Sequence, residues 1–278
     1  MEQPSHTPTT IGNLLIISRF ELVRLFQTTR GLMSIAAFAI IWYFILRYAI
    51  QTASQFVGIP GFRESVGEMF GQVGLRNLLD WPVAEFTVFW LFSLFLFPLF
   101  SITITADQTS SDRSRGTLRF LTLRTSRDSI FFGRFLGQMM ILTLLISGTV
   151  TATLLMAVYN NSDNLASSLN SAIIMGINLI IVVMPFTAMM AMFSAAVRSS
   201  RLAITAATIC WGVLQGLIGY LSYKWAFFEP LSMILPGHQL PDLIQTTQWE
   251  TLQHSPLPLI QTAVLLLIGR TIVARSSL

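Results

Sequence analysis

Six long runs of apolar residues, separated by polar segments, constrain the fold of this chain more than any other feature. The runs cover about residues 32–50, 82–106, 135–159, 170–197, 202–223 and 257–274. A helix needs about 20 apolar residues to cross a hydrocarbon core about 30 Å thick, and each run is close to or above that length. Because lipid offers no hydrogen bonds to the backbone, runs of this length predict transmembrane α-helices.

The overall composition agrees with this prediction. Apolar residues make up 53% of the chain and charged residues only 11%, against about 25% charged residues in a typical soluble domain. We therefore expect an all-α polytopic membrane protein in which residues 1–278 form a single transmembrane domain. The net charge of +4 does not indicate nucleic acid, because the arginines flank the apolar runs and topology explains them.

Residues 11–30 precede the first run and are too polar to cross a membrane. On a helical projection, Ile11 and Leu15 fall near one face, whereas Glu21 and Arg24 fall on the opposite face. This amphipathic pattern predicts an interfacial helix on the cytoplasmic membrane surface. A plain cytoplasmic extension of the first span is the alternative.

Two longer segments separate the runs on the other side of the membrane. Residues 51–81 are polar and contain glycines, so they predict an outer loop. Residues 224–255 mix tryptophan and phenylalanine with three prolines. This second segment is too broken to span and too apolar for a free loop, so it predicts short outer interfacial or re-entrant helices.

The distribution of basic residues predicts the orientation. With both ends in the cytoplasm, the inner segments hold most of the basic residues, namely Arg19, Arg24, Arg30, Arg113, Arg115, Arg119, Arg124, Arg127, Arg134, Arg198, Arg201, Arg270 and Arg275. The outer side keeps only Arg47, Arg63, Arg76 and Lys224. Positive charge concentrates on the cytoplasmic side of membrane proteins, so we expect six spans with both termini inside.

Familiar catalytic motifs are missing from the sequence. It contains no H-E-x-x-H, no G-x-S-x-G and no phosphate-binding loop, and its only lysine is Lys224. Cys210 lies in an apolar run and is interpreted as a small buried residue. His6, His238 and His254 lie outside the apolar runs and do not predict a metal cluster. We expect no catalytic, cofactor or metal site in this chain, so energy must come from a partner or from a substrate gradient.

The segment 107–134, between the second and third runs, is rich in arginine. Within it, Thr117–Leu123 is an apolar run too short to span, and Ser126 and Asp128 suit the start of the next helix. A short helix here would present leucines to a groove on a soluble partner, with arginines around them. The alternative is a basic loop that only enforces topology and binds anionic lipid headgroups.

This segment resembles the membrane subunit of type-2 ABC exporters. The matching residues are Asp112, Arg113, Arg115, Gly116, Thr117, Leu118, Arg119, Leu121, Ser126 and Arg127. The family typically has E-R-x-x-G-T-L at this place, so Asp112 replaces the usual glutamate. Thr125 replaces the proline that commonly precedes Ser-Arg. The order of the interfacial helix, the six spans and the outer helices agrees with the same family.

The resemblance implies how the chain would work. A cytoplasmic coupling helix between spans two and three would dock on a separate ATPase subunit, which binds ATP and Mg²⁺. Two permeases and two ATPases would form the unit, in the bacterial inner membrane, and cargo would pass between the permeases. The implied ATPase-coupling residues are Arg113, Arg115, Gly116, Thr117, Leu118, Arg119, Leu121 and Arg127.

Two alternatives remain open at this point. The chain could transmit mechanical work to a periplasmic partner, as some relatives in that family do, or be a membrane scaffold without transport. The cargo is also open. The lack of charge deep in the spans favours an amphipathic molecule such as a lipid, peptide or drug over a bare metal ion.

Overall fold

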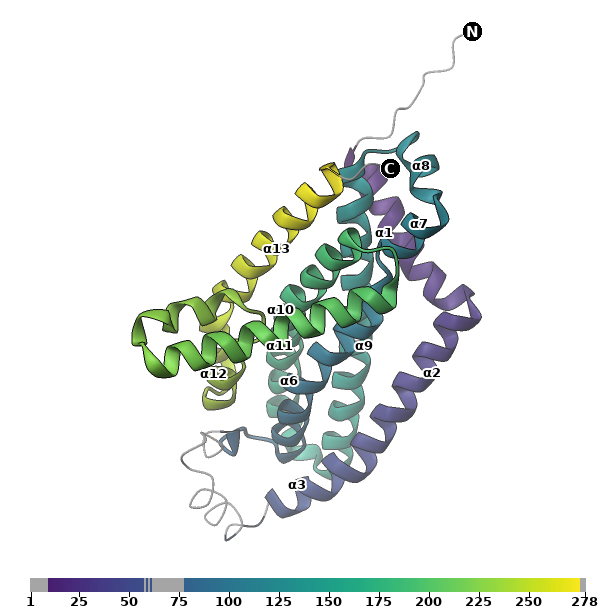
Figure 1. Cartoon of the computed structure of the whole chain (residues 1–278). Helices are drawn as coiled ribbons and strands as arrows, with labels where there is room; N and C mark the ends of the chain where they lie inside the picture. Colours follow the sequence, from purple (N-terminus) through teal and green to yellow (C-terminus); the bar gives the residue numbers. More distant parts are fainter. Residues whose placement is uncertain (1–9, 58, 60, 62–77, 276–278) are drawn as a thin grey trace.

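The computed structural model describes residues 10–57, 59, 61 and 78–275, and all the regular structure within these ranges is helical. Six helical stretches in this part of the chain are long and apolar enough to cross a membrane. They are Gly31–Val57, Ala84–Arg115, Arg127–Asn160, Ser162–Ala196, Ser200–Lys224 and Gln248–Arg275. The prediction of an all-α polytopic membrane protein is therefore confirmed (Figure 1). Part of the predicted outer loop, residues 62–77, lies outside the described residues.

The longer helices follow the apolar runs in order. They are α1 (Thr10–Gln27), α2 (Thr29–Phe44), α3 (Gln51–Val57), α6 (Ala84–Ile104), α9 (Arg127–Asn160), α10 (Leu165–Ala196), α11 (Ser200–Lys224) and α13 (Pro256–Arg275). A π-helical stretch, η1 (Ile45–Ile50), joins α2 to α3. The shorter elements are η3 (Thr105–Asp107), α7 (Ser110–Arg115), α8 (Thr117–Thr122), η4 (Ser162–Asn164), η5 (Ala226–Ile234), α12 (Leu240–Gln245) and η6 (Gln248–His254).

Helix α10 is the centre of the bundle. It packs against α6, α9, α11 and α13, and side chains are buried along most of its length. Helices α2 and α11 lie at the edges and bury few of their residues. Because they are nevertheless apolar, these edge helices offer their outer faces to lipid or to another membrane chain.

An aromatic cluster fixes the middle of α2 to α6. Trp42 stacks on Phe97, with ring centroids 5.2 Å apart, and Phe38 meets Phe100 edge to face at 5.3 Å. Aromatic pairs of this kind each add about 0.5–1.5 kcal/mol beyond the burial of their area. The first turns of α2, in contrast, diverge from the bundle at a bend after α1 (Figure 1).

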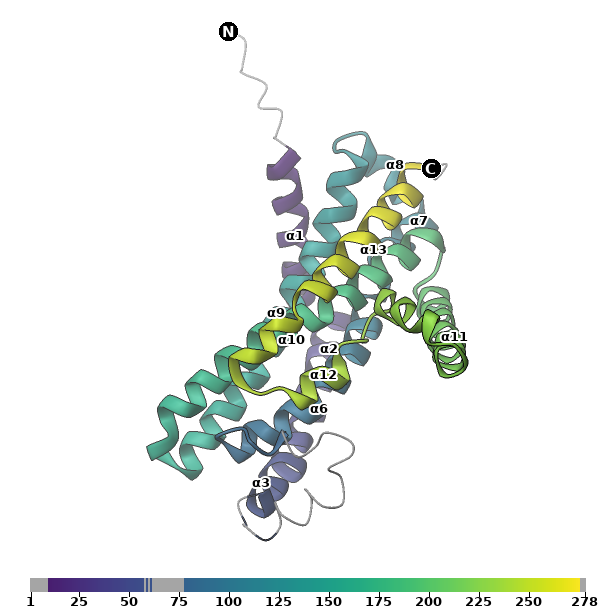
Figure 2. The same ribbon diagram turned by 90° about the vertical axis from the view of Figure 1, so that its left-hand side faces the viewer.

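Helix α1 packs on the first turns of α9, as the second view also shows (Figure 2). The contact depends on Gly133 and Gly137, because a Cβ at Gly137 would lie 2.7 Å from the Cβ of Glu21. Glycines four residues apart let two helices approach closely. The polar face of α1, including Glu21, therefore faces α9, while Ile11 is 72% exposed.

The segment 224–255 forms short helices that fold back onto the bundle. Helix α11 is followed by η5, which runs back along it. The indole nitrogen of Trp211 then donates to the carbonyl of Pro236 at 2.9 Å, and that of Trp90 donates to Leu243 at 3.1 Å. The amide of Asn178 donates to Thr251 in η6 at 2.8 Å. These bonds tie the segment to α6, α10 and α11.

Candidate functional site

The arginine-rich segment forms two short helices, α7 and α8, at one end of the bundle (Figure 1). The start of α1 and the end of α13 lie at the same end. Gly116 separates the two helices with a φ of +70°, in the left-handed region that favours glycine. We call residues 107–127 the α7–α8 loop.

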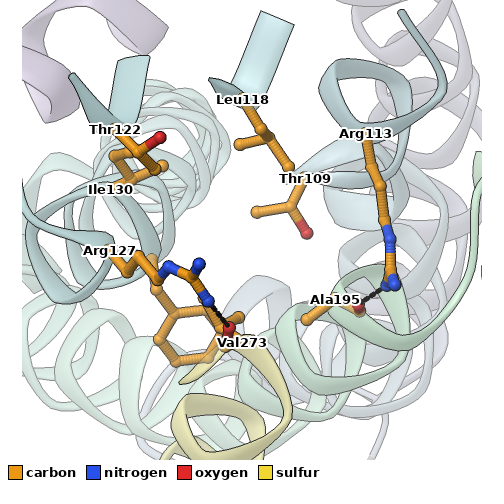
Figure 3. A pocket seen from close by; sticks show the side chains of 9 residues that line it. Thr109, Arg113, Leu118, Thr122, Arg127, Ile130, Ala195 and Val273 are labelled. Carbon is orange, nitrogen blue, oxygen red and sulfur yellow. Dashed lines mark hydrogen bonds between the residues drawn. The ribbon is translucent and has the colours of Figure 1, made fainter. Parts of the chain in front are cut away.

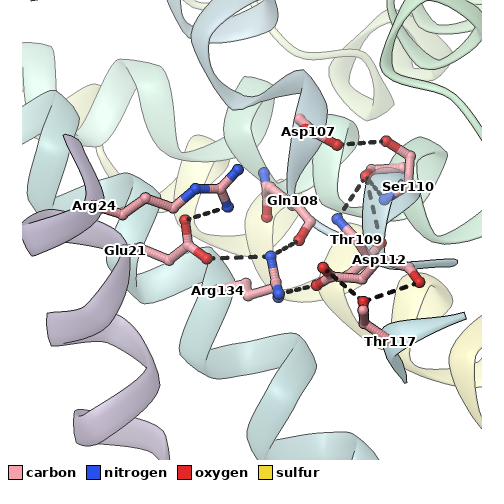
Figure 4. A network of polar contacts seen from close by, with 10 residues as sticks. Glu21, Arg24, Asp107, Gln108, Thr109, Ser110, Asp112, Thr117 and Arg134 are labelled. Atoms are coloured by element: carbon pink, nitrogen blue, oxygen red, sulfur yellow. Dashed lines mark hydrogen bonds and ion pairs between the residues drawn. The ribbon is translucent and has the colours of Figure 1, made fainter. Parts of the chain in front are cut away.

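A buried arginine from α9 ties this loop to α1 (Figure 4). Arg134 is only 6% exposed, and its Nη1 donates to the carbonyl oxygen of Gln108 at 2.6 Å. The same nitrogen lies 3.1 Å from Oε1 of Glu21. Its Nη2 is paired with a carboxylate oxygen of Asp112. One guanidinium thus joins α1, the α7–α8 loop and α9.

This network corrects two expectations from the sequence. Arg134 was counted among the arginines of the inner segments between the spans, but it lies two turns inside α9 and is buried. Glu21 was placed on the polar face of a surface helix, but it is 4% exposed and faces α9. Each of the two residues explains the burial of the other, because a buried charge is tolerated only when opposite charges and hydrogen bonds surround it.

The loop is also attached to the end of α10. The hydroxyl oxygen of Ser194 accepts the backbone N–H of Thr109 at 2.9 Å and that of Ser110 at 3.1 Å. Nη1 of Arg113 donates to the carbonyl of Ala195 at 2.6 Å. The last carbonyls of a helix have no partner within it, and an arginine there satisfies them.

Arg127 makes the same kind of contact with α13. Its Nη1 donates to the carbonyls of Val273 and Ala274, both at 3.1 Å. Next to it, Asp128 pairs with Arg270 at 2.7 Å. Ser126 caps α9 by accepting the N–H of Ser129 at 3.1 Å, so the predicted helix start is confirmed.

A small pocket lies between these anchors (Figure 3). It is narrow, with about 30 Å³ of space, and its lining is mostly apolar. Leu118 points into it from α8, between Arg113 and Arg127. Leu118 therefore packs inward, and it is not a freely exposed residue.

Several residues of the loop are exposed, and three of them are apolar. Phe120 is 73% exposed and Leu123 is 82% exposed, with Leu121 beside them. Arg115 and Arg124 are also exposed. We call these five residues the outer face of the loop.

The remaining predicted site residues have other surroundings. Thr117 is exposed, but its hydroxyl donates to the backbone oxygen of Asp112 at 3.2 Å. Arg119 lies in α8, and its side chain is outside the described side chains.

Sequence reasoning missed several residues of this site. Phe120 and Leu123 were not singled out from the short apolar run, because an isolated turn of helix has no periodicity to show which side is outward. Arg134 could have been found from its context. It stands between Gly133 and Gly137, the spacing at which helices pack closely, and an arginine inside such a contact needs a carboxylate partner.

Six helices that are long and apolar enough to cross a membrane, with an anchored helical loop between the second and third, define a multi-pass membrane protein. The chain belongs to the ABC-2 family of transporter proteins, whose family model matches residues 11–271. It is thus the membrane subunit of an ABC transporter, and membership of the family implies pairing with an ABC ATPase subunit. A search among curated proteins gives no match.

Proposed function

We propose that this permease belongs to an ATP-driven exporter and that the α7–α8 loop couples it to the ATPase subunit. The observation that carries the proposal is the two-sided construction of the loop. One side is attached to the ends of α1, α9, α10 and α13 by side chains. The other is the exposed outer face.

The outer face has the composition of a docking surface. Phe120 and Leu123 supply apolar area, and the exposed Arg115 and Arg124 of the same loop supply positive charge. Interfaces commonly combine a buried aromatic anchor with arginines around it. A cleft on the ATPase that encloses Phe120 would therefore hold the loop and move it as a unit when ATP binds.

The attachments explain how such a movement would reach the membrane. Arg113 and Arg127 bind backbone oxygens of α10 and α13, so a displacement of the loop displaces these helix ends. Through Arg134 it also reaches α1. Packed helices respond to small shifts by changing between discrete arrangements, which is what alternating access requires.

In the complete transporter, this chain would be joined by ATPase subunits and a second permease copy. ATP and Mg²⁺ are bound by the ATPase, and this chain binds neither. A second permease copy packs on the apolar edges formed by α2 and α11, and lipid covers the rest. The protein lies in a bacterial inner membrane with both termini in the cytoplasm. The shared end of α1, α13 and the basic loop supports that orientation.

The test is co-purification of the permease with its ATPase. Phe120→Glu combined with Arg115→Glu should remove the ATPase from the complex while the permease still inserts in the membrane. Arg198→Glu is the matched control, because Arg198 is exposed and outside the loop. If the double variant assembles and hydrolyses ATP like the parent, the coupling assignment is wrong.

Direction of transport needs a second measurement. An exporter reconstituted in inverted vesicles should accumulate its cargo on addition of ATP. A complex that hydrolyses ATP without moving any cargo would instead fit mechanical work on a periplasmic partner.

A further inference from the structure

A second cavity lies beside α1, and no residue of the outer face lines it. It opens between the bend that joins α1 to α2, the end of α6 and residues 138–141 of α9, and contains about 440 Å³ of space. Figure 1 shows the bend standing away from the bundle. We call this cavity the elbow cleft.

The rim of the elbow cleft carries an arginine with unused hydrogen-bond donors. The side chain of Arg24 is 40% exposed, and its nearest carboxylate oxygen, on Glu21, is 3.7 Å away. It donates no side-chain hydrogen bond within the described part of the chain, whereas Arg113 and Arg127 donate to carbonyls. Glu21 is held more closely by Arg134, at 3.1 Å. The guanidinium of Arg24 is therefore available to an anion.

Deeper in the cleft, Gln138 supplies a second polar group. It lines the cavity from α9 and is only 7% exposed. No hydrogen bond joins its amide to another side chain or backbone group of the described residues, and the side chain lines the cavity. A ligand that brings oxygen atoms to this depth would accept hydrogen bonds from this amide.

The walls beyond Gln138 are apolar and leave room. On the cleft side of α2 stand the small residues Gly31, Ser34 and Ala37. Below them the edge-to-face pair of Phe38 and Phe100 closes the cavity. The cavity thus changes from charged groups, namely Arg24 with the carboxylates of Glu21 and Asp107, to the amide of Gln138 and then to an apolar wall.

This order matches one class of ligand. We propose that the elbow cleft binds a phospholipid from the leaflet beside the α7–α8 loop. Its phosphate lies on Arg24, its glycerol ester oxygens reach Gln138, and one acyl chain runs past Ala37 to Phe100. A free phosphate would leave the apolar part empty, and a plain hydrocarbon would leave Arg24 and Gln138 unpaired. The proposal does not depend on the ATPase.

The test compares lipid retention by two neighbouring variants. The full chain is placed in nanodiscs of phosphatidylethanolamine and phosphatidylglycerol, released with mild detergent and weighed by native mass spectrometry. One phospholipid per chain should remain bound to the parent. Ala37→Phe fills the cleft and should lose this lipid. Ala36→Phe changes the next residue, which is exposed and outside the cleft, and should keep it.

Equal retention by these two variants would overturn the proposal. Arg24→Gln guards against a folding defect in Ala37→Phe, because it keeps the shape of the cleft. It should weaken lipid retention roughly tenfold, the effect of losing one charge-assisted hydrogen bond. Unchanged retention by Arg24→Gln would also contradict the assignment.

A second arm separates a lipid from a free anion. Dihexanoyl phosphatidylglycerol should raise the Tm of the detergent-solubilised chain, whereas inorganic phosphate at the same concentration should not. If phosphate alone gives the same shift, the site binds anions and not lipid, and the proposal fails.

Discussion

At the scale of single residues, Arg134 has the largest effect on the site. Its guanidinium is the point where α1, the α7–α8 loop and α9 meet, and its two carboxylate partners come from distant parts of the chain. A single buried guanidinium therefore holds these three elements together. The arrangement also makes the site sensitive, because each partner depends on the others for its charge balance.

Replacing Arg134 with methionine should destabilise the protein strongly. The change leaves Glu21 and Asp112 without their shared counterion, which costs about 3–5 kcal/mol for a buried pair. The measurement is thermal unfolding in detergent, with Arg124→Met as control, since Arg124 is exposed. An Arg134→Met protein that unfolds at the parent's temperature would show that the network does not stabilise the fold.

Ser194 offers a more local prediction. Ser194→Ala removes the acceptor for the N–H groups of Thr109 and Ser110 and leaves both donors buried. Each unsatisfied donor costs about 1–3 kcal/mol. Amide hydrogen exchange should become faster at residues 109–110 and stay unchanged in α12. If Ser194→Ala changes the exchange rate at residues 109–110 no more than in α12, Ser194 does not anchor the loop locally.

At the scale of elements, the bend between α1 and α2 sets the shape of the elbow cleft. Thr28 ends the first helix and caps the second by accepting the N–H of Gly31 at 3.1 Å. Gly31 is needed because a Cβ there would lie 2.1 Å from the carbonyl oxygen of Leu25. The angle between the two helices therefore depends on a single missing side chain.

Gly31→Ala should open this bend. The new methyl cannot fit beside Leu25, so α1 must move relative to α2. Spin labels at Ile16→Cys and Ile40→Cys, both exposed positions, report the distance in a Cys210→Ser background. Gly212→Ala is the control, because nothing lies within 4 Å of its Cβ. If the distance distribution of Gly31→Ala matches that of the parent, the bend does not depend on this glycine.

At the scale of the whole molecule, the order of the six helices could be predicted from the sequence, since lipid forces long apolar runs into helices. The pairing of α1 with α9 could not be predicted, because the residue pattern of a helix does not show which other helix it packs against. The pattern also does not show which side of a helix remains free of protein contacts. Cys210, interpreted as buried, is exposed on α11. An apolar run shows that a residue avoids water, and not whether protein or lipid covers it.

That exposure gives a test of the proposed second copy. Cys210 should react with a lipophilic maleimide when the permease is kept as a single chain in detergent. In the assembled complex the partner's α11 edge should protect it, and labelling should fall several-fold. If the complex contains one permease and Cys210 is labelled as fast as in the single chain, the α11 face contacts lipid and no second copy.

The contacts of Arg113 and Arg127 have a consequence for how such permeases diverge. Both arginines bind backbone oxygens at helix ends, and a backbone oxygen is present whatever residue occupies the position. Substitutions along α10 and α13 can therefore accumulate without breaking the attachment of the loop. The loop therefore constrains the ends of α10 and α13 through their main chain, and leaves their side chains free to vary.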